Sequence, residues 1–161
     1  MCRALVLDPL WNTSKVTHVC YSCAQEENGI ETIRESIWTE PGWRVAHSFN
    51  ASLAGWLVIV PRRHIESPDE MTFEESHTLG VLLRDASIAL KQVTKCQKTY
   101  VIMFAEAEGF SHLHFHVVPR LEDLPSDRRG PNIFAYLRET PLDEDAQDRV
   151  SLAIRDAWPS S

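Results

Sequence analysis

Three histidines in one short apolar stretch are the residues whose types and spacing most clearly suggest chemistry. Residues 112–118 read HLHFHVV, so every second residue from His112 to His116 is a histidine. Because side chains alternate across a β-strand, a strand here would place His112, His114 and His116 on one face and apolar residues on the other. Three imidazoles side by side carry an electrostatic cost that the fold must recover elsewhere. Two uses fit: a metal site, or a nucleophile and acid/base set for phosphoryl chemistry.

The four cysteines include one pair with an informative spacing. Cys20 and Cys23 form a Cys-x-x-Cys motif, whereas Cys2 and Cys96 stand apart. In a reducing compartment such a pair is either half of a metal site or a redox dithiol, and two unlinked thiols are a third interpretation.

The motif at residues 112–118 has the pattern His-φ-His-φ-His-φ-φ, where φ is apolar, and on these residues the chain resembles the histidine triad (HIT) family. The resemblance extends back through an apolar strand ending in VPRRHI at residues 60–65, a capped helix and a further strand, and it covers about residues 20–120. It implies that His114 attacks the α-phosphorus of a nucleotide and forms a nucleotidyl-histidine that water hydrolyses. It also implies that His116 hydrogen-bonds the phosphate or the bridging oxygen. His114 then needs a proton acceptor behind it, which in the family is a main-chain carbonyl.

The resemblance further implies a structural zinc ion. A branch of the family and the related galactose-1-phosphate uridylyltransferases use the first triad histidine as a metal ligand. Here Cys20, Cys23, His64 and His112 have the spacing Cys-x2-Cys-x40-His-x47-His, and two cysteines with two histidines form a closed tetrahedral Zn²⁺ site. We therefore expect zinc at these four residues, with no open position for water.

The loop before the triad departs from the family pattern. Residues 104–111 read FAEAEGFS and lack the Asn or Gln and the Gly-Gln-Ser/Thr triplet that contact phosphate in the family. Ser111 and backbone N–H groups are the remaining candidates for binding the phosphate, and an ionised Glu108 beside it would repel it. At the ribose position, near the end of the second strand, we expect Ser48 or Asn50 to bind the substrate.

Three other residues near these positions could have a structural or a functional role. We expect His47 to be structural, because a lone histidine is usually a packed or solvated side chain. Tyr21 and Trp56 could wall a base pocket, although aromatic residues that flank strands belong more often to the core.

The sequence predicts an α+β fold of the HIT type, with a mainly antiparallel sheet of about five strands, one long helix and C-terminal helices. A turn at Pro41-Gly42 joins the first two strands, and Pro119 ends the last. Capping boxes at Ser67 and Thr72 begin the long helix, which continues to about residue 93. Thr140 is the expected N-cap of the final helix. The expected strands are 33–39, 43–49, 55–60, 100–105 and 112–118, and the expected C-terminal helices are 130–137 and 141–157.

Composition limits the partners. The 161 residues are 43% hydrophobic and carry a net charge of −7, which fits one HIT domain (1–161) with its core at about 20–120 and a loosely attached helical extension at 121–161. The negative charge argues against binding a nucleic-acid polymer. The apolar run at residues 1–9 is too short for a signal peptide and no stretch is long enough to span a membrane, so we expect a cytoplasmic protein. Homodimerisation is expected from the resemblance alone.

The predicted function is hydrolysis, or less readily transfer, at the α-phosphate of a nucleotide. The substrate would be a nucleoside phosphoramidate, an acyl-adenylate or a dinucleoside polyphosphate. The alternative is a zinc-stabilised nucleotide-binding or interaction module with little turnover, because lost phosphate donors could abolish catalysis.

Overall fold

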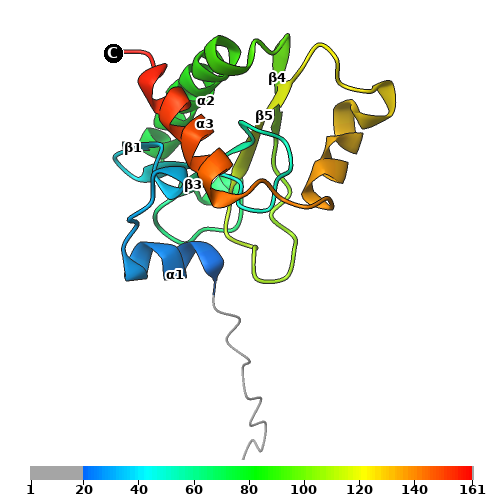
Figure 1. The fold of residues 1–161 in the computed structure, drawn as a ribbon. Coiled ribbons are helices and arrows are strands. Elements are labelled where there is room, and N and C mark those ends of the chain that lie inside the picture. Colours follow the sequence, from blue (N-terminus) through cyan, green and yellow to red (C-terminus); the bar gives the residue numbers. More distant parts are fainter. Residues whose placement is uncertain (1–19, 161) are drawn as a thin grey trace, which may run out of the picture.

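The computed structural model describes residues 20–160, which fold around one five-stranded antiparallel sheet (Figure 1). The strand order is β1-β2-β3-β5-β4, with Val45 paired to Ile59 and Val58 paired to His116. The strands are β1 (Trp38–Glu40), β2 (Trp43–His47), β3 (Leu57–Pro61), β4 (Lys98–Ile102) and β5 (Phe115–Arg120). This arrangement confirms the predicted fold class. The run at residues 1–9, and Cys2 within it, lie outside the described residues.

Two helices cover one face of this sheet: α2 (Phe73–Thr94) and α3 (Glu144–Asp156) (Figure 1). The shorter helical elements are α1 (Tyr21–Asn28), η1 (Ile33–Glu35), η2 (Pro68–Glu70), η3 (Ser126–Arg128) and η4 (Gly130–Leu137). Within residues 20–160 no helix is long and apolar enough to cross a bilayer.

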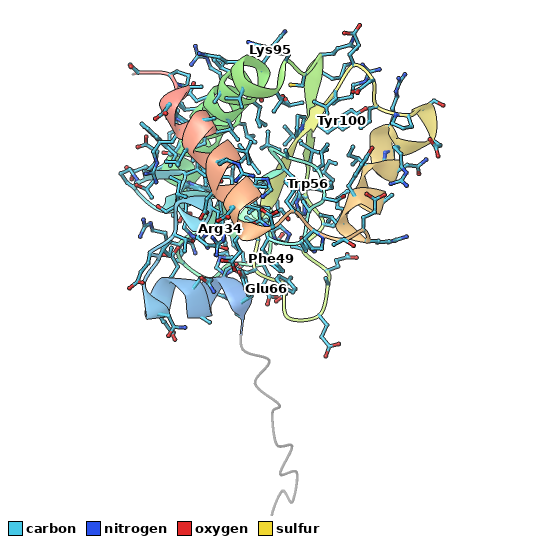
Figure 2. The ribbon with its side chains drawn as sticks, in the orientation of Figure 1. Arg34, Phe49, Trp56, Glu66, Lys95 and Tyr100 are labelled. Atoms are coloured by element: carbon cyan, nitrogen blue, oxygen red, sulfur yellow. The ribbon has the colours of Figure 1, made fainter. Side chains whose placement is uncertain are left out.

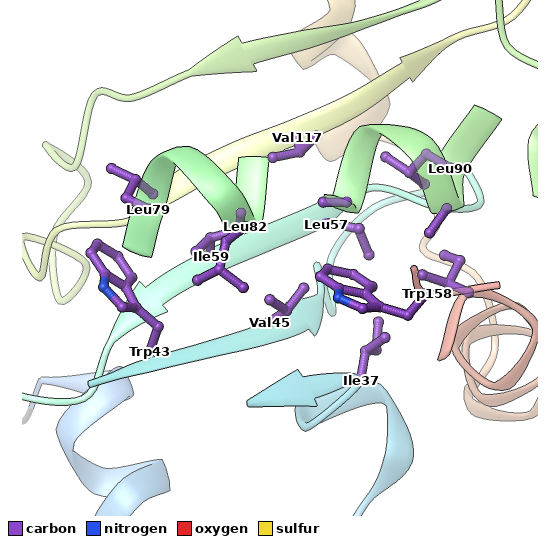
Figure 3. Close-up of a cluster of buried hydrophobic side chains, with 13 residues drawn as sticks. Ile37, Trp43, Val45, Leu57, Ile59, Leu79, Leu82, Leu90, Val117 and Trp158 are labelled. Carbon is purple, nitrogen blue, oxygen red and sulfur yellow. The ribbon is translucent and has the colours of Figure 1, made fainter. Parts of the chain in front are cut away.

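The main core lies between the sheet and these two helices (Figure 3). Trp43 and Val45 of β2 and Leu57 and Ile59 of β3 point into it, because strand side chains alternate between faces. The fully buried members of the cluster include Trp43, Val45, Leu57, Ile59 and Val117. The even-numbered side chains of the same strands are thereby directed to the opposite face, where the candidate site lies.

The long helix begins as predicted, at its second capping box. The Thr72 hydroxyl accepts the Glu75 N–H at 3.1 Å, and the Glu75 carboxylate accepts the Thr72 N–H at 2.8 Å. These two bonds satisfy backbone donors that a helix start leaves unpaired. The first box, at Ser67, begins only the short 3-10 element η2.

The carboxyl-terminal part is not loosely attached, contrary to our expectation. Ile154 and Trp158 belong to the main core, and the Trp158 ring stacks on Trp38 with centroids 5.3 Å apart. The final helix also begins later than predicted, with Asp143 as N-cap in place of Thr140. The reason is that the Leu142 N–H bonds the Ala51 carbonyl at 3.1 Å, which holds the preceding segment outside the helix.

The predicted boundaries of three strands were wrong. Residues 33–35 form η1, so β1 begins only at Trp38. Strand β4 begins two residues before Tyr100 and ends at Ile102, and β5 begins at Phe115 and includes Pro119. The proline is tolerated because β3 pairs with β5 only as far as Val117, so no β3 partner needs the missing N–H.

Candidate active site and metal centre

A cavity of about 500 Å³ opens on the sheet face opposite the main core. Its floor is formed by even-numbered side chains of β2 and β3, and its walls come from α1, the loop before β5 and η4. Both His114 and His116 line it. Figure 2 shows Phe49, another lining residue, close to the amino-terminal end of α1.

The His114 ring has one nitrogen committed to the backbone and one available to a ligand. Its Nδ1 lies 2.8 Å from the His112 carbonyl oxygen. A carbonyl can only accept a hydrogen bond, so Nδ1 carries the proton and Nε2 keeps its lone pair in the neutral ring. The main-chain acceptor that the resemblance implied is therefore the carbonyl of His112, two residues earlier, and sequence alone could not locate it.

The His116 ring has the opposite tautomer. Trp56 donates its indole N–H to His116 Nδ1 at 3.0 Å, and because indole can only donate, the proton of the neutral ring must be on Nε2. Burial, and to a smaller extent His114, lowers the pKa of His116 to about 3. His116 is thus a neutral N–H donor, with its ring centroid 4.8 Å from that of His114.

Trp56 is a residue whose role the sequence left open. It does not line the cavity but is fully buried, in the hydrophobic cluster that contains Ile133 of η4. Its contact with the site is the hydrogen bond to His116.

The three histidines do not share one face of a regular strand, which corrects the expectation from the motif. Only His116 lies within β5; His112 and His114 precede it in irregular backbone. His112 is buried and faces the two cysteines. One histidine of the triad therefore belongs to the candidate metal ligands, and the other two line the cavity.

The four predicted metal ligands come together. Cys20 Sγ lies 3.3 Å from His112 Nδ1, and Cys23 Sγ lies 3.4 Å from His64 Nδ1. One ligand atom from each of the four residues lies within 4.8 Å of the other three, a spacing that suits the corners of a small tetrahedron.

The surroundings of this cluster also fit a metal ion. His112 donates its Nε2 proton to the Pro61 carbonyl at 2.8 Å, and His64 Nε2 faces the Glu66 carboxylate at 3.4 Å. Both rings therefore present an Nδ1 lone pair to the cluster, which is the usual outer-shell arrangement of ligating histidines. The two histidines beside the cysteine pair favour a metal site over a redox dithiol, and the donor set of two cysteines and two histidines fits zinc.

The predicted substrate-binding residues are only partly brought together. Ser48 and Asn50 line the cavity, and the Ser48 hydroxyl donates to Asn50 Oδ1 at 2.9 Å. Ser111 does not line the cavity. Its hydroxyl donates to Glu66 at 3.0 Å, beside the four candidate metal ligands.

His47 has the structural role that we predicted, although its ring reaches the cavity wall. Its Nδ1 donates to the Ser48 carbonyl at 2.9 Å and its Nε2 accepts the Gly55 N–H at 3.1 Å. Burial lowers the pKa of His47 to about 4. Both nitrogens are used within the fold.

A buried charged group at the cavity was missed by the sequence reasoning. Arg44 is 2% exposed and bonds Glu26 at 2.9 Å and Glu35 at 3.0 Å. The signal was an arginine alternating with apolar residues in the second strand, but alternation alone would equally place it in solvent.

The loop before the triad also contributes to the cavity. Phe104, Ala105, Glu106 and Ala107 line it, and Ala105 has a left-handed backbone (φ 51°). Glu108, whose charge would repel a phosphate, is not among the lining residues.

Comparison with solved structures shows that this is the fold of histidine triad proteins. A hypothetical histidine triad nucleotide-binding protein from Sulfolobus tokodaii has a TM-score of 0.66 at 17% identity, over 86% of this chain and 91% of its own. A zinc-bound histidine triad family protein from Mycobacterium smegmatis has a TM-score of 0.61 at 18% identity, over 85% and 93%. A uridylyltransferase has a TM-score of 0.60 at 22% identity, over 88% of this chain but only 45% of its own. No family model and no curated protein sequence matches the chain.

Proposed function

We propose that this protein is a histidine triad enzyme that cleaves a nucleotide conjugate at the α-phosphate, with His114 as nucleophile. The observation that carries the proposal is the hydrogen bond from His114 Nδ1 to the His112 carbonyl. It fixes the tautomer whose Nε2 lone pair is free to attack, at the wall of a cavity large enough for a nucleotide.

The reaction has two displacements. His114 Nε2 forms a bond to the α-phosphorus while the bond to the leaving group breaks, and the leaving group departs with the electron pair of that bond. Water then attacks the phosphorus, the phosphorus–nitrogen bond breaks, and nucleoside monophosphate and free His114 result. Transfer differs only in the acceptor that replaces water; hydrolysis is our primary proposal.

His116 has the state that this chemistry needs in a hydrogen-bond donor. The hydrogen bond from Trp56 to Nδ1 keeps the ring proton of His116 on Nε2. We propose that this Nε2–H donates to the phosphate or to the bridging oxygen as charge develops there. At the other end, Ser48 and Asn50 are proposed to bind the ribose. Phosphate oxygens would be bound by backbone N–H groups of the loop at 105–107, which replaces the role we first gave to Ser111.

Zinc at Cys20, Cys23, His64 and His112 is proposed to be structural. A four-ligand site leaves no position for water, so the ion supplies cross-linking and charge neutralisation when bound and takes no part in the displacement. Because Cys20 is the N-cap of α1, the site attaches that helix, and with it Tyr21 of the cavity wall, to the triad. Free thiolates for the metal require a reducing compartment, and we propose the cytoplasm.

Metal analysis tests this assignment. Purified, untagged protein should contain one zinc per chain, and Cys20→Ser should lose the metal and unfold more readily, because binding free energy at such a site is folding free energy. Absence of zinc in the wild type, or a Cys20–Cys23 disulfide in reduced extract, would contradict it.

A homodimer is proposed on the unpaired edge of the sheet. Strand β4 is an edge strand and carries Val101, whose side chain is 49% exposed. Helix α2 carries two more exposed apolar side chains, Val81 at 48% and Ile88 at 39%. Helix α2 and β4 are neighbours here, since Ser87 and Thr99 share a hydrogen bond at 2.9 Å. Light scattering should give a dimer for the wild type and a monomer for Val101→Arg. A monomeric wild type would contradict the proposal.

One observation favours the second candidate, a nucleotide-binding module with little turnover. The cavity-lining loop has Glu106 where the family has polar phosphate donors, and loss of such donors can abolish catalysis. The discriminating assay offers wild type and His114→Ala a nucleoside phosphoramidate, an acyl-adenylate and a dinucleoside polyphosphate. Turnover by the wild type alone supports the enzyme; binding without turnover in either protein supports the module.

A further inference from the structure

The carboxylate of Glu35 forms part of the cavity wall and is fixed from two sides. Its Oε1 accepts the Tyr21 hydroxyl at 3.3 Å, and its Oε2 accepts Arg44 Nη1 at 3.0 Å. A carboxylate has about four lone-pair positions. Each oxygen therefore keeps one position for a further donor.

The buried guanidinium that holds Glu35 also bonds a second carboxylate and the main chain of Glu35. Arg44 Nε bonds Glu26 at 2.9 Å, and its Nη1 also bonds the Glu35 main-chain carbonyl at 2.8 Å. Glu26 receives a second cation, Arg62, at 3.3 Å. Removing a charge partner from a buried ion pair is costly, so the geometry of Glu35 is well determined. Glu35 therefore offers fixed hydrogen-bond acceptors at this end of the cavity.

The strand that carries Arg44 and the strand that follows His114 are two positions apart in the sheet. Arg44 of β2 pairs with Val60 of β3, and Ile59 of β3 pairs with Phe115 of β5, the residue after His114. Two strand spacings are roughly 10 Å between main chains. That separation is close to the span of a nucleoside 5′-monophosphate from its phosphorus to the far edge of its base.

An aromatic wall accompanies the carboxylate. The Tyr21 ring packs against Phe49 and Phe110, with centroids 5.0 and 5.4 Å away, and all three residues line the cavity above the valines of β3. Flat apolar surface of this kind supports a base by stacking but is indifferent to its identity. Any selection among bases must come from the polar group at its edge.

We propose that Glu35 determines base specificity and favours guanine, an assignment that rests on the proposed function of the cavity. Guanine presents two adjacent donors, N1–H and the 2-amino group, which match the two free acceptor positions of one carboxylate. Adenine and cytosine offer a single amino donor beside an acceptor nitrogen. Uracil offers one N–H between two carbonyls, which the carboxylate would repel.

Titration calorimetry with GMP, IMP, AMP and UMP tests the proposal. IMP differs from GMP only by the missing 2-amino group, so the wild type should bind GMP about tenfold more tightly than IMP. Glu35→Gln should reduce the ratio to nearly one, because the amide puts a donor where guanine needs an acceptor. Glu26→Gln is the matched control: it removes the same charge from Arg44 but does not line the cavity, and it should keep the GMP preference.

If the four monophosphates bind the wild type equally, Glu35 has no role in selection although the proposed function stands. If both Gln variants lose the preference alike, the effect comes from the Arg44 cluster and the assignment to Glu35 is wrong. If no monophosphate binds, the proposed function fails and this inference fails with it. Thermal melting of both variants shows whether they are folded, and the GMP to IMP ratio of the wild type does not depend on either.

Discussion

The two faces of the sheet use the same strands in opposite ways. Toward α2 and α3, the side chains of Leu57 and Ile59 are fully buried among apolar neighbours. Toward the cavity, their neighbours Val58 and Val60 form a floor beneath Arg44, His114 and His116. The period-two alternation of a strand allows one segment to serve both faces.

What differs between the faces is the kind of constraint. On the core face, the shape and volume of the side chains determine stability, because a missing methylene leaves a hole in the packing. On the cavity face, the positions of the ring protons determine the chemistry, because His114 and His116 each have a partner that can only accept or only donate a hydrogen bond. The His112 carbonyl fixes His114, and the Trp56 indole fixes His116. Changes on the two faces should therefore separate stability from chemistry.

The largest effect is expected from removing the proposed nucleophile. His114→Asn should lower kcat by several orders of magnitude, because the triad offers no other nucleophile and a zinc ion bound by all four proposed ligands would supply no hydroxide. Nucleotide binding, measured by titration calorimetry, and the free energy of unfolding should change little.

The stereochemistry of the same reaction gives an independent check. Two successive displacements invert the phosphorus twice, so a substrate chiral at the α-phosphorus should give product with overall retention. Mass spectrometry of enzyme quenched without acid should show the nucleotidyl group on His114. Net inversion would indicate a single displacement and exclude His114 as nucleophile, even with the fold unchanged.

A pair of neighbouring residues tests the comparison of the faces directly. Ile59→Ala should lower the free energy of unfolding by about 3 kcal/mol, because it opens a hole in the core, with KM unchanged. Val58→Ala, one residue earlier, should cost about 1 kcal/mol or less but raise KM, since it alters the cavity floor. Urea denaturation and steady-state kinetics measure both, and equal effects on KM would contradict the division.

Sequence reasoning predicted the parts of the site that local patterns determine. The triad spacing, the Cys-x-x-Cys pair and the capping box at Thr72 are local patterns, and the start of α2 follows from the last of them. The complete set of candidate metal ligands depended on a resemblance, because 40 residues separate Cys23 from His64.

The parts that sequence could not predict depend on long-range contacts. Helix α1 was missed, and its position depends on the cysteines reaching His64 and His112. The bond from Trp56 to His116 joins residues 60 positions apart. The strand predicted at residues 112–118 failed at its start because His112 bonds Pro61 and the cysteines rather than continuing a ladder.

A smaller effect is expected from pH acting on His47. Burial lowers its pKa to about 4, so between pH 6.5 and 4 the unfolded chain binds a proton that the native chain does not. Stability must then fall as pH falls through this range. From pH 7 to 5.5 the loss from His47 is about 1 kcal/mol. The difference in the free energy of unfolding between wild type and His47→Gln should shrink by that amount. Comparing the two proteins cancels any contribution from zinc release, which both would share. A difference that does not change with pH would contradict the prediction.

The smallest change should come from Trp56→Phe, and it isolates the tautomer of His116. The variant keeps an aromatic ring but loses the N–H that bonds His116 Nδ1 at 3.0 Å, so the ring proton can move from Nε2 to Nδ1 and the donor that faces the substrate is partly lost. We expect kcat to fall about threefold, because the donor is only partly lost, with KM little changed. Long-range nitrogen–proton NMR should show one tautomer in the wild type and a mixture in the variant. Phe134→Leu is the control, because the Phe134 ring packs against His116, with centroids 5.5 Å apart, but makes no hydrogen bond to it. This variant should keep the single tautomer. If Trp56→Phe also keeps the Nε2–H tautomer and full kcat, then the indole merely fills space, and burial alone fixes the state of His116.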